Sequence, residues 1–116
     1  MEINLIVIRT SNPKDLADFY NQLGIQFDYH QHGNGPFHYS SQIGKTVFEI
    51  YPLMKNQEKP DASLRLGFTI DKLDKVLNAL KKQKVEIIRE AKQSEWGYFA
   101  IIKDLDGRKI ELKNSQ

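Results

Sequence analysis

Apolar and polar residues alternate along residues 46–52, and this pattern is the clearest in the chain. In a strand, successive side chains point to opposite faces, so Phe48 and Ile50 share one face and Glu49 lies on the other. A carboxylate in the middle of an apolar strand indicates either a solvated face or a site. Because Glu111 also stands between two apolar residues near the end of the chain, the pattern favours a cavity that both glutamates line.

The first part of the chain predicts a strand, a helix and a second strand. Residues 3–9 form an apolar, β-branched run that is typical of a strand. A helix is expected next, because Asn12 can cap its first turn, Pro13 suits its first position and Gly24 suits its end. Residues 25–30 alternate again and predict a further strand with one apolar face.

A hairpin is expected over residues 37–52. We place its turn at Ile43 and Gly44, because glycine tolerates the positive φ that a two-residue turn requires. This register sets His38 opposite Glu49 on the polar face of the hairpin. The side chains expected on that face are His38, Ser40, Val47, Glu49 and Tyr51.

The second half of the chain repeats this order of elements. Residues 63–71, 85–90, 96–103 and 108–113 predict strands. A helix with an apolar stripe follows the first of these strands, and Asp71 is its expected cap. Both halves therefore read strand, helix and three strands, which is a tandem repeat of a βαβββ unit.

The fold class that follows is α+β. We expect two tandem βαβββ modules to form a curled mixed sheet around a cavity, with the helices on its convex side. Module one spans about residues 3–52, a linker about 53–62 and module two about 63–113, all within a single domain over residues 1–116. Such a cavity is a natural binding site for a small molecule.

Composition and charge narrow the function classes. A chain of 116 residues with 40% hydrophobic and 28% charged residues is typical of one globular domain. The net charge of +2 is too small to indicate a nucleic-acid partner, and the absence of cysteine excludes disulfides and thiolate chemistry. No apolar run is long enough to span a membrane and no signal peptide is visible, so we expect a cytoplasmic protein without a membrane partner.

Four stretches of the sequence, taken in order, resemble the vicinal oxygen chelate superfamily. This superfamily includes glyoxalases, bleomycin-resistance proteins, fosfomycin-resistance proteins and extradiol dioxygenases. The stretches are residues 9–13 with 19–24, then 47–52, 67–74 and 104–112. The resemblance covers nearly the whole chain and implies the fold and a homodimer. It does not imply one activity, because this fold carries unrelated chemistries.

In metal-using members of the superfamily, ligands come from the first and fourth strands of each module. The resemblance puts these positions at Leu5, Glu49, Arg65 and Glu111. Leu5 has no ligand atom and Arg65 is a cation, so no metal cofactor is expected. As an alternative, a divalent metal ion would be held by Glu49, Glu111 and His38. Without a metal, His38 is expected to form a structural hydrogen bond with Glu49.

Three functions compete. In the first, the chain binds a small organic ligand in the cavity of a homodimer, as bleomycin-resistance proteins do, and this fits the loss of two of the four ligand positions. The second is a metal-dependent lyase or dioxygenase, and the third is a non-enzymatic interaction module. The residues expected to bind the ligand are His38, Glu49, Tyr51, Arg65 and Glu111.

Charge suggests a role for Arg65, which occupies a position aimed at the same space as Glu49 and Glu111. Two carboxylates in one cavity repel each other, and a guanidinium stays charged at physiological pH. Two interpretations stay open: Arg65 bridges the two carboxylates in place of the lost metal, or it is an exposed arginine on a loose strand edge. His30 and His32 lie beside a turn-rich loop and are expected to face solvent.

Overall fold

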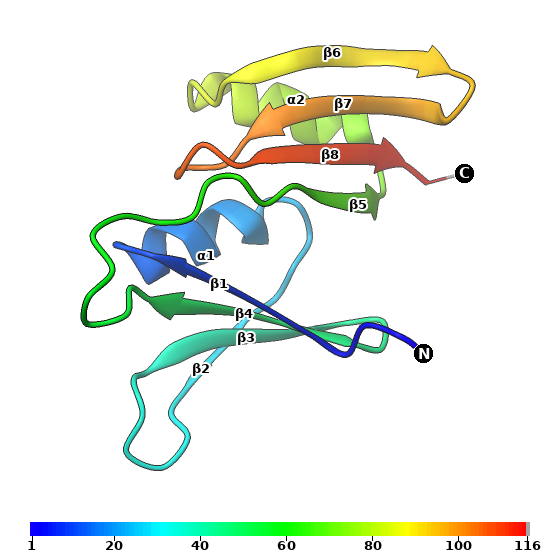
Figure 1. Ribbon diagram of the computed structural model, residues 1–116. Coiled ribbons are helices and arrows are strands. Elements are labelled where there is room, and N and C mark those ends of the chain that lie inside the picture. The colour runs from blue at the N-terminus through cyan, green and yellow to red at the C-terminus, as the bar shows by residue number, and fades with distance from the viewer. Residues whose placement is uncertain (116) are drawn as a thin grey trace. The chain divides into compact units, whose positions relative to one another are not determined.

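Each half of the chain folds into a four-stranded mixed sheet with one helix packed against one face (Figure 1). The computed structural model describes residues 1–115 as two units, the first spanning Met1–Asp61 and the second beginning at Ala62. These units contain the predicted modules one and two and are described separately under those names. The α+β class and the tandem βαβββ order are confirmed, while the shared cavity and the single domain stay predictions.

Module one has all of its predicted elements. They are β1 (Leu5–Thr10), α1 (Pro13–Asn21), β2 (Asp28–His30), β3 (His38–Ile43) and β4 (Thr46–Pro52). The strand order is β1-β4-β3-β2, with β1 parallel to β4 and the other pairs antiparallel. The strand predicted over residues 25–30 is shorter, because only its last part pairs with β3, and Ile25 is buried in the core.

Helix α1 starts as the sequence predicts. The side-chain Oδ1 of Asn12 accepts a hydrogen bond from the backbone N–H of Asp15 at 3.2 Å, and Pro13 occupies the first helical position. Gly24 has φ +107°, a conformation that side chains rarely tolerate, and it turns the chain away after the helix. The buried side chains of α1 are Leu16, Ala17, Phe19 and Tyr20.

The apolar face of the module-one sheet packs against α1. Phe48 and Ile50 are almost fully buried, and the Phe48 ring makes an edge contact with Tyr20 at 5.4 Å between centroids. Ile8 of β1 pairs with Ile50 and extends this layer. The predicted face assignment is therefore confirmed, because Phe48 faces the helix and the alternation turns Glu49 to the opposite face.

The turn of the β3–β4 hairpin lies at Gly44 and Lys45, one residue later than predicted. Ile43 pairs with Thr46 at the end of the ladder. Gly44 has φ +57° and supplies the positive φ at the first turn position. A β-branched residue such as Ile43 is strained there, so it remains in the strand instead.

This shift changes which residues face each other across the hairpin. Ser40 pairs with Glu49, so the predicted pairing of His38 with Glu49 is wrong. His38 instead stacks on Tyr51, with the ring centroids 4.1 Å apart. Because the pairing moves by an even number of residues, every side chain keeps its predicted face.

Module two repeats the arrangement. Its elements are β5 (Leu66–Ile70), α2 (Leu73–Lys82), β6 (Ile87–Ser94), β7 (Gly97–Lys103) and β8 (Lys109–Asn114). The strand order is β5-β8-β7-β6, with β5 parallel to β8. Since β5 begins later than predicted, Arg65 lies just before the strand and is exposed.

Helix α2 is not capped by Asp71, and this prediction is wrong. The capping position is taken by Lys72, which has φ +57° and makes no side-chain hydrogen bond to the helix. The first turn is satisfied from β8, where Asn114 Oδ1 accepts a hydrogen bond from the backbone N–H of Leu73 at 2.9 Å. Asp71 is used differently, because its carboxylate accepts a hydrogen bond from the Ser115 hydroxyl.

The turn between β7 and β8 contains a buried ion-pair network. Asp104 Oδ1 accepts hydrogen bonds from the backbone N–H groups of Asp106 and Arg108, and Gly107 has φ +92°. The buried Arg108 guanidinium lies 3.1 Å from Asp104 and 2.9 Å from Asp106. Burial by itself lowers the pKa of Arg108, but the two carboxylates outweigh this effect and the pKa is raised.

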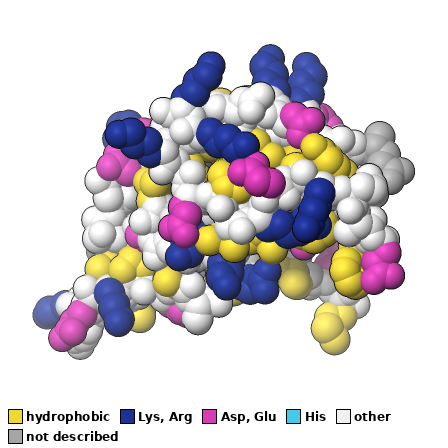
Figure 2. Space-filling view, turned by 90° about the horizontal axis from the view of Figure 1, so that it is seen from above, with side chains coloured by type: hydrophobic (Ala, Val, Ile, Leu, Met, Phe, Trp, Pro, Cys, Tyr) yellow, Lys and Arg dark blue, Asp and Glu magenta, His cyan; other side chains and the backbone are white. Residues whose placement is uncertain are grey.

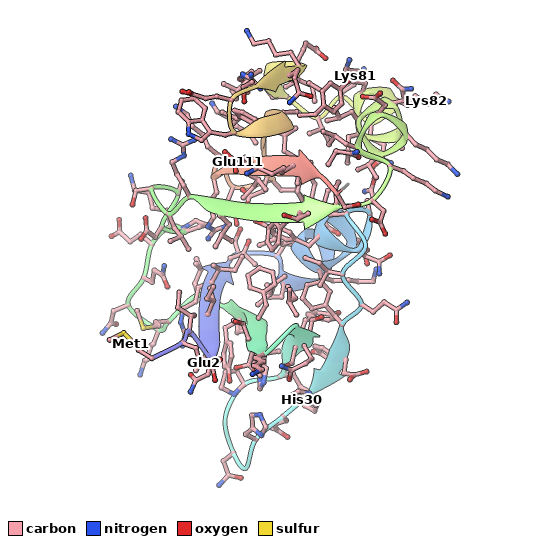
Figure 3. All side chains as sticks on the ribbon, turned by 90° about the vertical axis from the view of Figure 1, so that its right-hand side faces the viewer. Met1, Glu2, His30, Lys81, Lys82 and Glu111 are labelled. Atoms are coloured by element: carbon pink, nitrogen blue, oxygen red, sulfur yellow. The ribbon has the colours of Figure 1, made fainter. Side chains whose placement is uncertain are left out.

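Surface charge agrees with the small net charge of the chain. On the face shown in Figure 2, Lys and Arg side chains are interspersed with Asp and Glu side chains, and apolar atoms show between them. At the end of α2, Lys81 and Lys82 are exposed (Figure 3), and Lys81 forms an ion pair with Glu90 at 2.7 Å. Among the described residues, no helix is long and apolar enough to cross a membrane.

Candidate functional site

The face of the module-one sheet opposite α1 carries three of the predicted ligand-binding residues. Strand pairing arranges its side chains in rows that cross the sheet. One row consists of Arg9, Tyr51, His38 and His30, and the next consists of Val7, Glu49, Ser40 and Asp28. We call this surface the polar face of module one.

The first row is a continuous stack of flat side chains. The Arg9 guanidinium lies 4.9 Å from the centre of the Tyr51 ring and donates a hydrogen bond to the Pro52 carbonyl. Tyr51 stacks on His38 at an interplanar angle of 9°, and His38 meets His30 edge-on at 4.5 Å. This stacking fixes the plane of the His38 ring and buries it completely.

Glu49 lies beside this stack and is only 8% exposed. Its Oε2 atom is 3.3 Å from Nε2 of His38. The two atoms are not aligned as a hydrogen bond, and Nε2 is a buried polar atom without a hydrogen-bond partner. Burial raises the pKa of the Tyr51 hydroxyl, the negative charge of Glu49 raises it further, and the positive charge of Arg9 opposes both effects.

The other ring nitrogen of His38 determines its tautomer. Nδ1 lies 3.1 Å from the carbonyl oxygen of Pro36, which can only accept a hydrogen bond. Nδ1 therefore carries the proton, and the neutral ring has its lone pair on Nε2, facing Glu49. A lone pair facing a carboxylate is unfavourable unless a proton or a cation lies between them.

His30 and His32 do not both point away into solvent, contrary to expectation. His32 is exposed, but its ring lies 5.0 Å from that of His38, and Nε2 of His32 is 3.2 Å from Nε2 of His30. Figure 3 shows His30 at the end of β2, where the chain enters the loop of residues 31–37. The loop folds back because Gly33 has φ +56° and the Gly35 N–H donates to the His32 carbonyl.

These side chains form one cluster of possible metal ligands. One ligand atom from each of His30, His32, His38 and Glu49 lies within 4.8 Å of the others. Sequence reasoning missed the two outer histidines. The available signal was the spacing of His30 and His32 on the strand that precedes His38, because a short hairpin returns the chain to the same place.

Two apolar side chains of β1 lie exposed on the polar face. Leu5 is 52% exposed and Val7 is 38% exposed. Val7 is the strand neighbour of Glu49. The polar face thus combines a buried acid and an aromatic ring with open apolar surface.

The remaining predicted site residues lie in module two. Glu111 is half-buried on β8, next to Gly67 on β5. A Cβ atom added to Gly67 would lie 3.4 Å from Oε2 of Glu111. Arg65 forms no ion pair with Glu111 within residues 1–115. The bridge to Glu111 that the sequence predicts is therefore not formed.

Module two also contains a pocket of about 480 Å³. It lies beside the β6–β7 hairpin and the end of β8. Trp96 is exposed at this pocket, and the Tyr98 hydroxyl donates to Asp74 at 2.7 Å. The lining residues are Thr69, Gln93, Trp96, Gly97, Tyr98, Lys113, Asn114 and Ser115.

Comparison with known proteins identifies the family. The model of the Glyoxalase/Bleomycin resistance protein/Dioxygenase superfamily matches residues 2–112. The chain belongs to this superfamily. A search of curated proteins finds no significant match.

Solved structures share the superfamily fold. TnmS3, an antibiotic binding protein from Streptomyces sp. CB03234, is 22% identical, with a TM-score of 0.77 and coverage of 100% of this chain and 97% of that chain. A glyoxalase/bleomycin resistance protein from the same strain is 23% identical, with a TM-score of 0.72 and coverage of 97% and 99%. Oxidase ChaP-H2 is 13% identical, with a TM-score of 0.76 and coverage of 100% and 94%.

The ligand positions of metal-using superfamily members do not fit a metal here. Leu5 is an exposed aliphatic side chain and Arg65 is an exposed cation, so neither offers a lone pair to a metal. On β1 and β5, the partners of Glu49 and Glu111 are Val7 and Gly67, whose side chains also lack ligand atoms.

Proposed function

We propose that this superfamily member binds a small organic molecule on the polar face of module one and needs no metal ion for this binding. The observation that carries the proposal is the exposed Val7 beside the buried Glu49, with Leu5 exposed two residues earlier on the same face and Tyr51 in the next row. Ligand sites combine apolar and aromatic surface with a few fixed polar groups, and this face has that composition.

The side chains of the polar face have different roles in this proposal. Tyr51 is held by stacking between Arg9 and His38, so its ring is fixed in place and only the edge of the ring is left to contact a ligand. Glu49 accepts a hydrogen bond from the ligand, and the buried His38 positions both neighbours. Arg65 and Glu111, which the sequence also predicts to bind the ligand, belong to module two and stay predictions.

The similarity to an antibiotic binding protein agrees with this function. The second candidate is a metal-dependent lyase or dioxygenase that uses His38, Glu49 and Glu111. The close approach of His38 to Glu49 favours it. The metal-dependent function requires a metal ion that Glu111 also binds, whereas ligand binding in the first candidate requires no metal.

We expect bleomycin, or another member of a panel of aromatic antibiotics, to bind metal-free protein in calorimetry. Tyr51→Ala should weaken this binding by up to about tenfold, because one aromatic contact contributes about 0.5–1.5 kcal/mol. Tyr29→Ala is the matched control, since Tyr29 is 58% exposed and alternates onto the other face of the sheet. Equal effects of the two changes would show that the ligand does not use the polar face.

We also propose that the protein is a homodimer, as the superfamily resemblance implies. Exposed Leu5 and the edge strands β2 and β6 offer surface that a second copy would cover. Sedimentation at tens of micromolar should then give about 27 kDa, twice the 13.5 kDa of the chain. A species of single-chain mass under these conditions would contradict the proposal.

A further inference from the structure

We propose that module one contains a site for a divalent transition-metal ion, with zinc as the best-fitting metal, formed by His30, His32, His38 and Glu49. All four side chains belong to module one. The site shares Glu49 with the superfamily positions, but its other three ligands are histidines outside those positions, and it does not need Leu5, Arg65 or Glu111. It goes beyond the proposed ligand binding, which requires no metal.

The β2–β3 hairpin brings the four ligands together. His30 and His38 are direct partners across this antiparallel pair, so their side chains share a face. His32 follows two residues after His30 and is folded back by the loop of residues 31–37. Glu49 projects from the neighbouring strand β4 on the same face, 3.3 Å from His38.

The distances suit a tetrahedral site. Zinc bonds of about 2.1 Å to nitrogen and oxygen place neighbouring ligand atoms about 3.4 Å apart. The Nε2 atoms of His30 and His32 are 3.2 Å apart, and Nε2 of His38 is 3.3 Å from Oε2 of Glu49. One ligand atom from each of the four residues lies within 4.8 Å of the others, so metal binding would require the His30 and His32 side chains to rotate until both pairs reach one ion.

The protonation of His38 prepares it as a ligand. Its Nδ1–H donates to the Pro36 carbonyl, which is the outer contact that metal-bound histidines commonly make. Nε2 is left buried, without a hydrogen-bond partner and directed at a carboxylate. A metal ion between Nε2 and Glu49 satisfies both atoms at once.

The chemistry of the ligand set selects the metal. Three imidazoles and one carboxylate favour zinc and its neighbours in the first transition row, whereas magnesium and calcium prefer oxygen ligands. Four protein ligands close a tetrahedral shell, and closed zinc sites are structural. The ion would therefore fasten the 31–37 loop to β4 beside the proposed ligand surface.

The test uses untagged full-length protein that has been stripped with EDTA and then titrated with zinc chloride against a chromophoric chelator. We expect one zinc ion per chain and no competition by magnesium. His32→Ala and His30→Ala should each weaken zinc binding by at least about 100-fold. Loss of a residue that only hydrogen-bonds to a metal ligand costs up to about 100-fold, and loss of the ligand itself should cost at least as much. Both positions are at least partly exposed, so these variants should fold.

Two further variants complete the test. Asp28→Asn removes an exposed carboxylate from the same strand and face, and it should change affinity by less than about fivefold, the effect of one surface charge. Glu111→Gln should also leave zinc affinity unchanged. The proposal is overturned if zinc does not bind, if His32→Ala binds it as well as the native chain, or if Glu111→Gln weakens binding as strongly as His32→Ala. Antibiotic binding by metal-free protein is measured separately, so either proposal can fail without the other.

Discussion

Phe48→Ala is expected to lower the free energy of unfolding by about 3–5 kcal/mol, the usual cost of removing a buried phenylalanine ring. The ring is 1% exposed and packs against Tyr20 and Phe27, so its removal leaves a cavity between β4 and α1. Urea denaturation followed by circular dichroism measures this loss.

The neighbouring residue provides the matched control for this change. Val47 projects from the same strand to the polar face and is only partly buried. Val47→Ala should therefore cost about 1 kcal/mol or less, because two partly exposed methyl groups are lost. If Val47→Ala costs more than Phe48→Ala, the assignment of the two faces is wrong, and the positions of Glu49 and His38 on the polar face are wrong with it.

Arg108→Met should destabilise the protein by a similar amount, about 3–5 kcal/mol. The guanidinium forms a buried ion pair with Asp104 and a second pair with Asp106. Methionine fills the same space but leaves the Asp104 carboxylate buried without its cation, and an uncompensated buried charge is costly. Thermal and urea unfolding at neutral pH should both report the loss.

A change at the next residue separates this effect from a general loss of positive charge. Lys109 is exposed, so Lys109→Met should shift the free energy of unfolding by no more than about 0.5 kcal/mol. Comparable effects of Lys109→Met and Arg108→Met would mean that the ion-pair network contributes little to stability.

The fold could be predicted because its signals are local and repeat in both modules. Alternation in β4 separates Phe48 from Glu49, and helix signals at Asn12 and Gly24 set the limits of α1. The register of the β3–β4 hairpin was harder to predict than the strand faces and the helix limits. It depends on whether Gly44 takes the first or the second turn position, and both choices keep the same residues on each face.

The parts that the sequence did not reveal depend on contacts between distant residues. Helix α2 takes its cap from Asn114 on β8, which is far along the chain from Leu73. Arg108 is charged and follows a turn, which usually indicates exposure, but two aspartates pair with it in the interior.

The histidine cluster illustrates the same limit at the candidate site. His38 and Glu49 were expected on one face, and this is confirmed by the strand pairing. The approach of the exposed His32 ring to His38 depends on the path of the 31–37 loop, which turns at Gly33 and which a strand pattern does not describe. Arg65 and Glu111 were linked through charge alone, and the structure places Arg65 outside β5.

The central claim is that the polar face of module one binds a small organic molecule, and amide chemical-shift mapping of the full chain with an antibiotic from the binding panel tests it most directly. The account predicts the largest shifts in residues 5–9 and 47–51, on β1 and β4, with smaller shifts along α1. Shifts confined to Trp96 and Tyr98 at the module-two pocket, with β1 and β4 unchanged, would contradict it.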